Sequence, residues 1–257
     1  MGTNNRFDLS RRAALVTGGS KGLGKAIARG FAEAGADVMV SSRNADELRD
    51  ASAEIGRGLS VRVEWSVADM REPRQVDELA ATALARLGRV DILVNNAGSN
   101  TPQALDEITD EKWKEILELN LSSVMRLSRA LAGQMKARRW GRIIHISSIM
   151  ALGSKEGRSA YSATKAALMG LARAGALDLG PHGITVNCIA PGPFLTDLPG
   201  RVLTDAEKRG FAERTALGRW GDTDEIVGPT LLLASDAGSY ITGSTMVVDG
   251  GALARIF

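Results

Sequence analysis

A tyrosine and a lysine four residues apart interrupt a run of small side chains in the segment "SAYSATKAAL" (159–168). Four residues make about one helical turn, so Tyr161 and Lys165 would share one face of a helix. A phenol with its usual pKa near 10 is too weak an acid for ready proton exchange at neutral pH. A lysine ammonium one turn away favours the phenolate and is expected to lower that pKa. The pair therefore predicts proton-transfer chemistry, the alternative being an exposed helical pair.

A glycine-rich segment, "TGGSKGLG" (17–24), joins an apolar run typical of a buried strand to an amphipathic run typical of a helix. Gly18, Gly22 and Gly24 have no side chains where the backbone must turn and approach a ligand. The helix that follows offers free N–H groups and the positive end of its dipole to a pyrophosphate. This context predicts a dinucleotide-binding loop, with a tight turn that binds nothing as the alternative.

The end of the second predicted strand, "VSSRN" (40–44), bears on the choice of cofactor. In dinucleotide sites an acidic residue here binds the ribose 2′-hydroxyl, whereas an arginine accommodates a 2′-phosphate. Ser42 and Arg43 occupy this place, and Lys21 in the glycine segment adds a second positive charge. The sequence therefore predicts NADP(H) as cofactor and NAD(H) as less favoured, unless Arg43 is an ordinary surface arginine.

These motifs, in this order, resemble the short-chain dehydrogenase/reductase family over nearly the whole chain. The glycine segment resembles the family's TGxxxGxG loop, "NNAG" (95–98) its motif after the fourth strand, and "YSATK" its YxxxK motif. Ser148 precedes Tyr161 by thirteen residues, and Asn120 lies in "LELNLSS"; both match family positions. No catalytic position departs from the family pattern.

The resemblance implies a role for each matched residue. Tyr161 would be the general acid/base, Ser148 would bind the substrate oxygen, and Lys165 would hold the nicotinamide ribose. Asn120 would hold a water that links Lys165 to solvent, and Asp69 would lie beside the adenine. The expected cofactor-binding residues are Gly18, Ser20, Lys21, Gly22, Leu23, Gly24, Ser42, Arg43, Asp69, Met70, Asn96, Ala97, Gly98, Tyr161, Lys165, Pro191, Gly192 and Thr196.

By the same resemblance the chain would move a hydride between NADP(H) and a ketone or secondary alcohol. "PGPFLTDL" with "RTALGRWGDTDEIVG" resembles relatives acting on gluconate-type sugar acids, and the general outline equally resembles 3-oxoacyl-carrier-protein reductases. Specificity is expected in the loops 149–158 and 193–215 and in the stretch after Gly98, "SNTPQALDEIT". Lys155 and Arg158 of the first loop could meet an anionic substrate. The alternative is a dinucleotide-binding sensor or scaffold without turnover, which would be expected to lose catalytic residues that are present here.

Short apolar segments alternate with amphipathic ones along the chain, as in a parallel sheet covered on both faces. We therefore predict a single doubly wound, Rossmann-type α/β domain over 1–257, with a mostly seven-stranded parallel sheet; a closed eight-unit barrel is the alternative. The predicted strands cover 13–18, 36–42, 59–67, 90–98, 141–148, 183–191 and 244–251. The predicted helices cover 23–35, 45–56, 71–88, 109–135, about 158–179, 204–214 and 222–235.

Composition narrows the classes of partner. With 44% hydrophobic and 24% charged residues the chain is typical of a globular protein, and no apolar run approaches the roughly 20 residues of a membrane span. A net charge of +2 makes nucleic acid an unexpected partner. The single Cys188 cannot pair within the chain and fits the cytoplasm, and two distant histidines predict no metal site.

The helix expected at about 158–179 is apolar or small on nearly all sides. Such a helix should be buried on most sides, so its outer face, with Leu168 and Leu171, is expected to pack against a second copy. The family resemblance implies pairing through this helix and 109–135, and again through the last helix and strand. A homotetramer is therefore predicted, with a monomer as the alternative.

Overall fold

Seven parallel strands form one sheet in the computed structural model, which describes residues 6–196 and 204–254. The strand order is β3-β2-β1-β4-β5-β6-β7, and every neighbouring pair is parallel. The described strands are β1 Ala13–Thr17, β2 Asp37–Ser42, β3 Val63–Val67, β4 Ile92–Asn95, β5 Gly141–Ile146, β6 Ile184–Pro191 and β7 Thr245–Val248. The predicted fold class is confirmed, and the closed barrel is wrong.

Helices connect the strands, and two of them begin at side chains that cap their first turn. Asn44 caps one helix by accepting from the N–H groups of Asp46 and Glu47, and Thr109 caps another by accepting from Lys112. The described α-helices are α1 Gly22–Glu33, α2 Ala45–Gly56, α3 Pro73–Leu87, α4 Asp110–Leu117, α5 Ser123–Arg138, α6 Ser159–Leu179, α8 Asp205–Ala212 and α9 Val227–Ala234.

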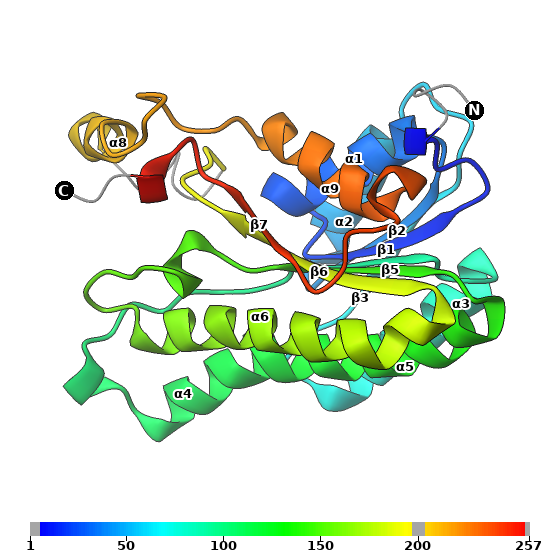
Figure 1. Cartoon of the computed structure of the whole chain (residues 1–257), viewed down its shortest axis with the longest axis horizontal. Coiled ribbons are helices and arrows are strands. Elements are labelled where there is room, and N and C mark those ends of the chain that lie inside the picture. Colours follow the sequence, from blue (N-terminus) through cyan, green and yellow to red (C-terminus); the bar gives the residue numbers. More distant parts are fainter. Residues whose placement is uncertain (1–5, 197–203, 255–257) are drawn as a thin grey trace.

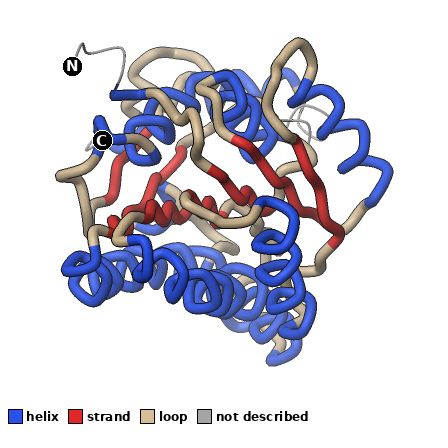
Figure 2. Tube along the Cα trace, turned by 90° about the vertical axis from the view of Figure 1, so that its right-hand side faces the viewer, coloured by secondary structure: helices blue, strands red, loops and turns tan. Residues whose placement is uncertain are grey.

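Two helical layers cover the two faces of the sheet. In Figure 1, α1, α2 and α9 lie above the sheet, and α4, α5 and α6 lie below it. Figure 2, turned by 90°, shows the strands as a layer between these helices. Each layer buries its own apolar cluster, one around Phe31 and Ile144 and the other around Leu127 and Leu168. Across the described ranges, no helix is long and apolar enough to span a bilayer.

Several predicted elements differ from the observed ones. The strand predicted at 90–98 covers only Ile92–Asn95, and the one predicted at 244–251 only Thr245–Val248. The third strand begins at Val63 rather than at 59, and residues 59–62 after the turn at Gly58 (φ +76°) are not part of the strand. The helix predicted at 109–135 is divided into α4 and α5 by a π-helical turn, Glu118–Ser122. The helix predicted at 222–235 begins as a 3₁₀ turn, Thr223–Ile226, before α9.

Candidate active site

The predicted site residues gather at one edge of the sheet because all seven strands run in the same direction. The glycine segment follows β1, "NNAG" follows β4, Ser148 follows β5, and Pro191 ends β6. The chain turns from β1 outward to β2 and β3, and then returns to β4 on the other side of β1. Loops that leave such a switch point diverge and open a crevice for a ligand.

The loops after β1 and β4 are joined by hydrogen bonds at this switch point. The Thr17 hydroxyl accepts from the backbone N–H groups of Asn96 (3.1 Å) and Ala97 (3.0 Å). The Asn96 side chain donates to the carbonyls of Thr17 (2.9 Å) and Gly18 (3.1 Å). Asn96 and Ala97 therefore fix the conformation of the glycine loop. This structural role is separate from the contact with the cofactor that the sequence predicts for them.

The glycine positions of this loop leave little or no space for a side chain. Gly18 and Gly22 have φ values of +65° and +55°, which favour glycine. A Cβ at Gly24 would lie 2.3 Å from the Gly18 carbonyl oxygen, and one at Gly22 would lie 3.3 Å from Thr196 Cγ2. Thr196 thus lies over the loop at the start of α1, and the two line a hollow of about 340 Å³ that also includes Ser20 and Lys21.

Lys165 is a buried cation between α6 and the end of β5. Only 4% of the residue is exposed, and its Nζ donates to the Ile146 carbonyl oxygen at 2.7 Å. The Ser147 hydroxyl donates to the Lys165 carbonyl oxygen, also at 2.7 Å, so both ends of the residue are tied to the same strand end. Burial lowers the pKa of Lys165 from 10.5 to about 8. This pKa is close enough to neutral pH for the ammonium to exchange its proton readily.

The expected lowering of the Tyr161 pKa by Lys165 is not found. Burial raises the pKa of the Tyr161 phenol, against the opposing effects of the Ser148 hydroxyl and the Arg158 charge. The Lys165 ammonium lies 5.7 Å from the centroid of the Tyr161 ring and is directed at Ile146, which explains its small influence. Tyr161 is therefore protonated at neutral pH.

Asn120 lies in the π-helical turn and is completely buried. Its side chain donates to the Ser99 carbonyl (2.9 Å) and the Thr164 hydroxyl (3.2 Å), and it accepts from the Ser99 N–H (2.9 Å). A Cβ at Gly98 would lie 3.2 Å from Asn120 Oδ1 and 3.3 Å from Lys165 Nζ. Glycine thus leaves a small space open between the amide and the ammonium. Single π turns within helices are frequent at functional sites.

The residues expected at the 2′-phosphate site do not contribute equally. Lys21 forms an ion pair with Glu47 (3.1 Å), which also accepts from the Ser20 hydroxyl, so its charge is compensated. Arg43 is exposed and has no ion pair within the described ranges. The Ser42 hydroxyl is buried and has no hydrogen-bond partner among the described residues. Arg43 is thus the cation of this strand end that has no ion pair, although its charge acts on Asp69.

The segment expected beside the adenine is tied to α4. Arg71 pairs with Asp69 (2.6 Å) and with Glu115 (2.8 Å), and its hydrogen bond to Asp69 lowers the pKa of that carboxyl group. The Met70 side chain packs into the core, so only its backbone can face a ligand. Leu23 likewise packs against the core of the α1 face.

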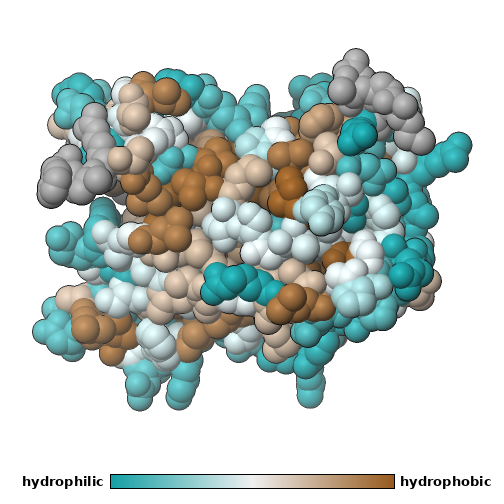
Figure 3. All heavy atoms as spheres, in the orientation of Figure 1, coloured by the Kyte–Doolittle hydropathy of each residue, from teal (hydrophilic) through white to brown (hydrophobic). Residues whose placement is uncertain are grey.

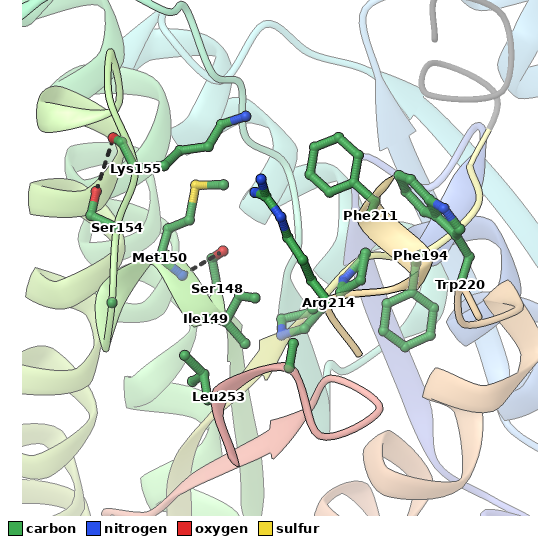
Figure 4. Close-up of a pocket in the computed structure, with 15 residues that line it drawn as sticks. Ser148, Ile149, Met150, Ser154, Lys155, Phe194, Phe211, Arg214, Trp220 and Leu253 are labelled. Carbon is green, nitrogen blue, oxygen red and sulfur yellow. Dashed lines mark hydrogen bonds between the residues drawn. The ribbon is translucent and has the colours of Figure 1, made fainter. Parts of the chain in front are cut away.

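A pocket of about 420 Å³ opens beside Ser148, and its lining comes from four separate segments. The residues drawn in Figure 4 include Lys155, one of the two cations expected to face a substrate. The other, Arg158, donates to the Asn100 side chain at 3.3 Å and is not among the lining residues. Pro191 and Gly192 line this pocket, with Gly192 packed too closely on Asp249 for a side chain.

The sequence did not single out Arg214 or Leu253 as pocket residues. Arg214 lies within the predicted loop 193–215, of which 197–203 fall outside the described residues. Trp220 packs against Phe211 at 5.3 Å between ring centroids, and both residues line the pocket. The 193–215 prediction was the only signal for Arg214, and no signal pointed to Leu253.

Comparisons with known proteins agree with this geometry. The model of the family described as enoyl-(acyl carrier protein) reductase matches residues 18–252. The chain is 40% identical to the 3-oxoacyl-(acyl-carrier-protein) reductase FabG of Escherichia coli over 93% of this chain and 96% of that protein. It is 35% identical to a gluconate 5-dehydrogenase of Gluconobacter oxydans, over 95% and 96% of the two chains.

A solved structure extends the likeness to three dimensions. The gluconate 5-dehydrogenase of Burkholderia cenocepacia, in complex with NADP and tartrate, superposes with a TM-score of 0.92 at 35% identity. The match covers 99% of this chain and 100% of that one. The chain therefore belongs to the short-chain dehydrogenase/reductase family and is an oxidoreductase.

The buried Lys165 ammonium should make the protein less stable at neutral pH than a neutral side chain would. The folded state holds this proton only below about pH 8, whereas the unfolded chain holds it up to about 10.5. The unfolded state binds more protons between these values, so stability should rise with pH across this window. Lys165→Met should raise the free energy of unfolding at pH 7 by about 2 kcal/mol, after subtraction of the lost Ile146 hydrogen bond.

Urea unfolding at pH 7 and pH 10 checks this expectation. The advantage of Lys165→Met should shrink at the higher pH, while a Lys136→Met control, at an exposed lysine of α5, should leave the pH dependence of the wild type unchanged. Equal differences at both pH values would show that the ammonium carries no burial penalty.

Proposed function

We propose that the protein transfers a hydride between NADP(H) and a ketone or secondary alcohol, with Tyr161 as general acid/base. The observation that carries the proposal is the shared placement of Tyr161, Ser148, Lys165 and Asn120 at the edge of the sheet that also holds the glycine loop. The relatives' names suggest two substrate classes, a gluconate-type sugar acid and a 3-oxoacyl thioester.

The residues present fit NADP(H). The glycine loop forms a cradle that a Cβ at Gly18 or Gly24 would fill, next to the first turn of α1, where free N–H groups can bind a pyrophosphate. The Ser42 hydroxyl, which has no hydrogen-bond partner in the described chain, and the exposed Arg43 guanidinium can hold a 2′-phosphate. Lys165, whose Nζ lies beside Gly98, can hold the nicotinamide ribose.

The bound nicotinamide would supply the hydride to the carbonyl carbon. Tyr161 would donate its phenolic proton to the carbonyl oxygen, and Ser148 would donate a hydrogen bond to that oxygen as its negative charge grows. Burial keeps the phenol protonated at neutral pH. The Ser148 hydroxyl and the Arg158 charge, which oppose the rise of its pKa, would stabilise the phenolate that remains. In the oxidative direction the same groups would act in reverse.

The proton that leaves Tyr161 must be replaced from solvent. Lys165, with a pKa of about 8, can carry a proton near neutral pH, and Asn120 offers its amide on the other side of Gly98. A water between the Asn120 amide and the Lys165 ammonium would complete the relay. Ser99 and Thr164 hold the amide in place for that water.

Replacement of Tyr161 by phenylalanine should lower kcat by at least about 10²-fold, since it removes the proton donor. Binding of NADPH should persist, because the phenol is not needed for the phosphate contacts. The only other tyrosine, Tyr240, is fully exposed, so Tyr240→Phe is a matched control that should leave turnover unchanged.

Initial rates at 340 nm with a panel of ketones and keto acids, and fluorescence titration with NADPH, give both quantities. Turnover near the wild-type rate in Tyr161→Phe would remove the proposed mechanism. Binding of NADPH by the wild type without turnover of any carbonyl compound would instead favour the sensor or scaffold.

Replacement of Arg43 by aspartate should shift the cofactor preference toward NAD by at least about tenfold, or 1.4 kcal/mol. The change removes the exposed cation and offers a carboxylate to the ribose 2′-hydroxyl. Ratios of kcat/KM for NADPH and NADH measure the shift. Arg57→Asp, at the opposite end of α2, should leave the ratio unchanged. A wild type that uses NADH as well as NADPH would contradict the role assigned to Arg43.

We further propose a homotetramer, supported by the outer face of α6. The face of α6 turned toward the viewer in Figure 1 is mostly white to brown in Figure 3, with charged groups between. Leu177 on this helix is 80% exposed. The expectation that Leu168 faces a second copy is wrong, because Leu168 is completely buried within its own chain, and Leu171 is partly buried there. Leu177 is therefore the residue on which to test the contact.

Light scattering at micromolar concentration tests the assembly. The wild type should have a mass near four times the chain's own 27.2 kDa. Leu177→Glu should lower this mass without unfolding the chain, because the side chain is exposed in a single copy. Val67→Glu, a charged replacement of an exposed residue on the edge strand β3, should leave the mass unchanged. A wild-type mass near 27.2 kDa would overturn the proposal.

We propose the cytoplasm as the compartment, supported by the state of Cys188. The thiol is buried in β6, donates to the Leu168 carbonyl, and has its pKa raised by burial to about 12. A protein whose lone cysteine is a buried, unreactive thiol uses no disulfide for its stability, which is usual in a reducing compartment.

A further inference from the structure

The pocket beside Ser148 is large enough to enclose a small molecule of the size of a substituted keto acid. Its volume of about 420 Å³ lies in the usual range of ligand sites. Ser148 faces it from the end of β5, Phe194 comes from the segment after β6, Arg214 follows α8, and Leu253 comes from the end of the chain. A substrate with its carbonyl at Ser148 must therefore place its other groups against these segments.

The charge of the pocket is of one sign. Lys155 and Arg214 line it, and no aspartate or glutamate is among the lining residues of the described chain. In Figure 4 both side chains extend toward the same end of the pocket. Nearby Arg219 is neutralised by two contacts with Glu225 at 2.7 Å, whereas Arg214 has no ion pair or side-chain hydrogen bond in the described ranges. Uncompensated cations that converge on a cleft attract an anion.

The walls of the pocket are apolar. Ile149, Met150, Phe194, Phe211 and Leu253 are among the lining residues, and Figure 4 shows them around Ser148 and Arg214. The polar side chains that remain are engaged elsewhere. Ser154 is hydrogen-bonded to Ser162 at 2.8 Å, and the Trp220 N–H donates to the Lys208 carbonyl at 2.8 Å. The hydroxyl groups of a sugar acid would find few partners here, and an unpartnered buried hydroxyl opposes binding.

Resting on the proposed carbonyl reduction, we propose that the substrate is a carbonyl compound with a carboxylate and an apolar body. The carbonyl oxygen binds at Ser148 and Tyr161, the apolar body packs on the five apolar walls, and the carboxylate binds Arg214 and Lys155. The guanidinium of Arg214 can bind a carboxylate through two parallel hydrogen bonds, so Arg214 should contribute more than Lys155 to binding of the carboxylate. Such a substrate combines the charge of a sugar acid with the apolar body of an acyl chain.

Matched substrates test the assignment with the intact enzyme and NADPH. Phenyl-substituted 2-oxo, 4-oxo and 5-oxo acids vary the distance between carbonyl and carboxylate, and each is compared with its methyl ester. An oxidised sugar acid, 5-ketogluconate, and a thioester, acetoacetyl-CoA, represent the two classes that the relatives' names suggest. At least one acid should exceed its ester, 5-ketogluconate and acetoacetyl-CoA by about tenfold in kcat/KM, which is 1.4 kcal/mol. Its KM should rise with ionic strength, and that of the ester should not.

Variants locate the anion site. Arg214→Ala should raise KM for the acid about tenfold, or 1.4 kcal/mol, with a smaller change in kcat and none for the ester. Lys155→Ala should have a smaller effect in the same direction, and Arg214→Lys should recover part of the loss. Arg209→Ala is a matched control, because Arg209 is an exposed cation of α8 outside the pocket. Thermal melting should show that each variant is folded, since these side chains are exposed.

The outcomes separate this assignment from the proposed function. Esters, acetoacetyl-CoA or 5-ketogluconate reduced as well as the best acid would overturn the assignment and leave the carbonyl reductase intact. An acid preference that survives Arg214→Ala and Lys155→Ala would overturn the site. Failure of every carbonyl compound, neutral esters included, to consume NADPH would overturn the proposed function and this inference together.

Discussion

The hydrogen bond from Lys165 Nζ to the Ile146 carbonyl places a buried charge between two elements that are far apart in the sequence. A buried ammonium is costly unless polar groups surround it, and here the only directed partner given by the described chain is the end of β5. Together with the Ser147 hydroxyl on the Lys165 carbonyl, it fixes the rotation of α6 about its axis. Because Tyr161 lies one turn earlier on the same face, its position relative to Ser148 depends on this contact.

A second constraint acts at the switch point of the sheet. The Thr17 hydroxyl and the Asn96 side chain join the loops after β1 and β4, which would otherwise diverge. Gly18 and Gly24 complete this contact, because a side chain on either would collide with Asn96. The rigid glycine cradle is therefore a product of both loops. Its distance from the Lys165 site is set by β4 and β5, in which Ile92–Asn95 pair with Arg142–His145.

The sequence predicted what depends on neighbouring residues along the chain. Apolar and amphipathic runs are local, so the order of strands and helices followed from them. The π turn around Asn120 did not, because it arises from contacts with Ser99 and Thr164, more than twenty residues away on either side. The Lys21–Glu47 pair was missed for the same reason, and it changes which cation can select the cofactor.

This division between local and distant determinants separates chemistry from specificity. The groups proposed for proton transfer come from motifs that a single sequence reveals, since they must keep fixed spacing on one helix or one strand end. The pocket walls come from segments as distant as Met150 and Leu253, and no spacing rule links them. A single change there, such as an acid opposite Arg214, would alter the charge of the pocket without touching Tyr161 or Lys165. Relatives with the same catalytic edge can therefore act on substrates as different as a sugar acid and an acyl thioester, and the substrate of each must be inferred from its own pocket.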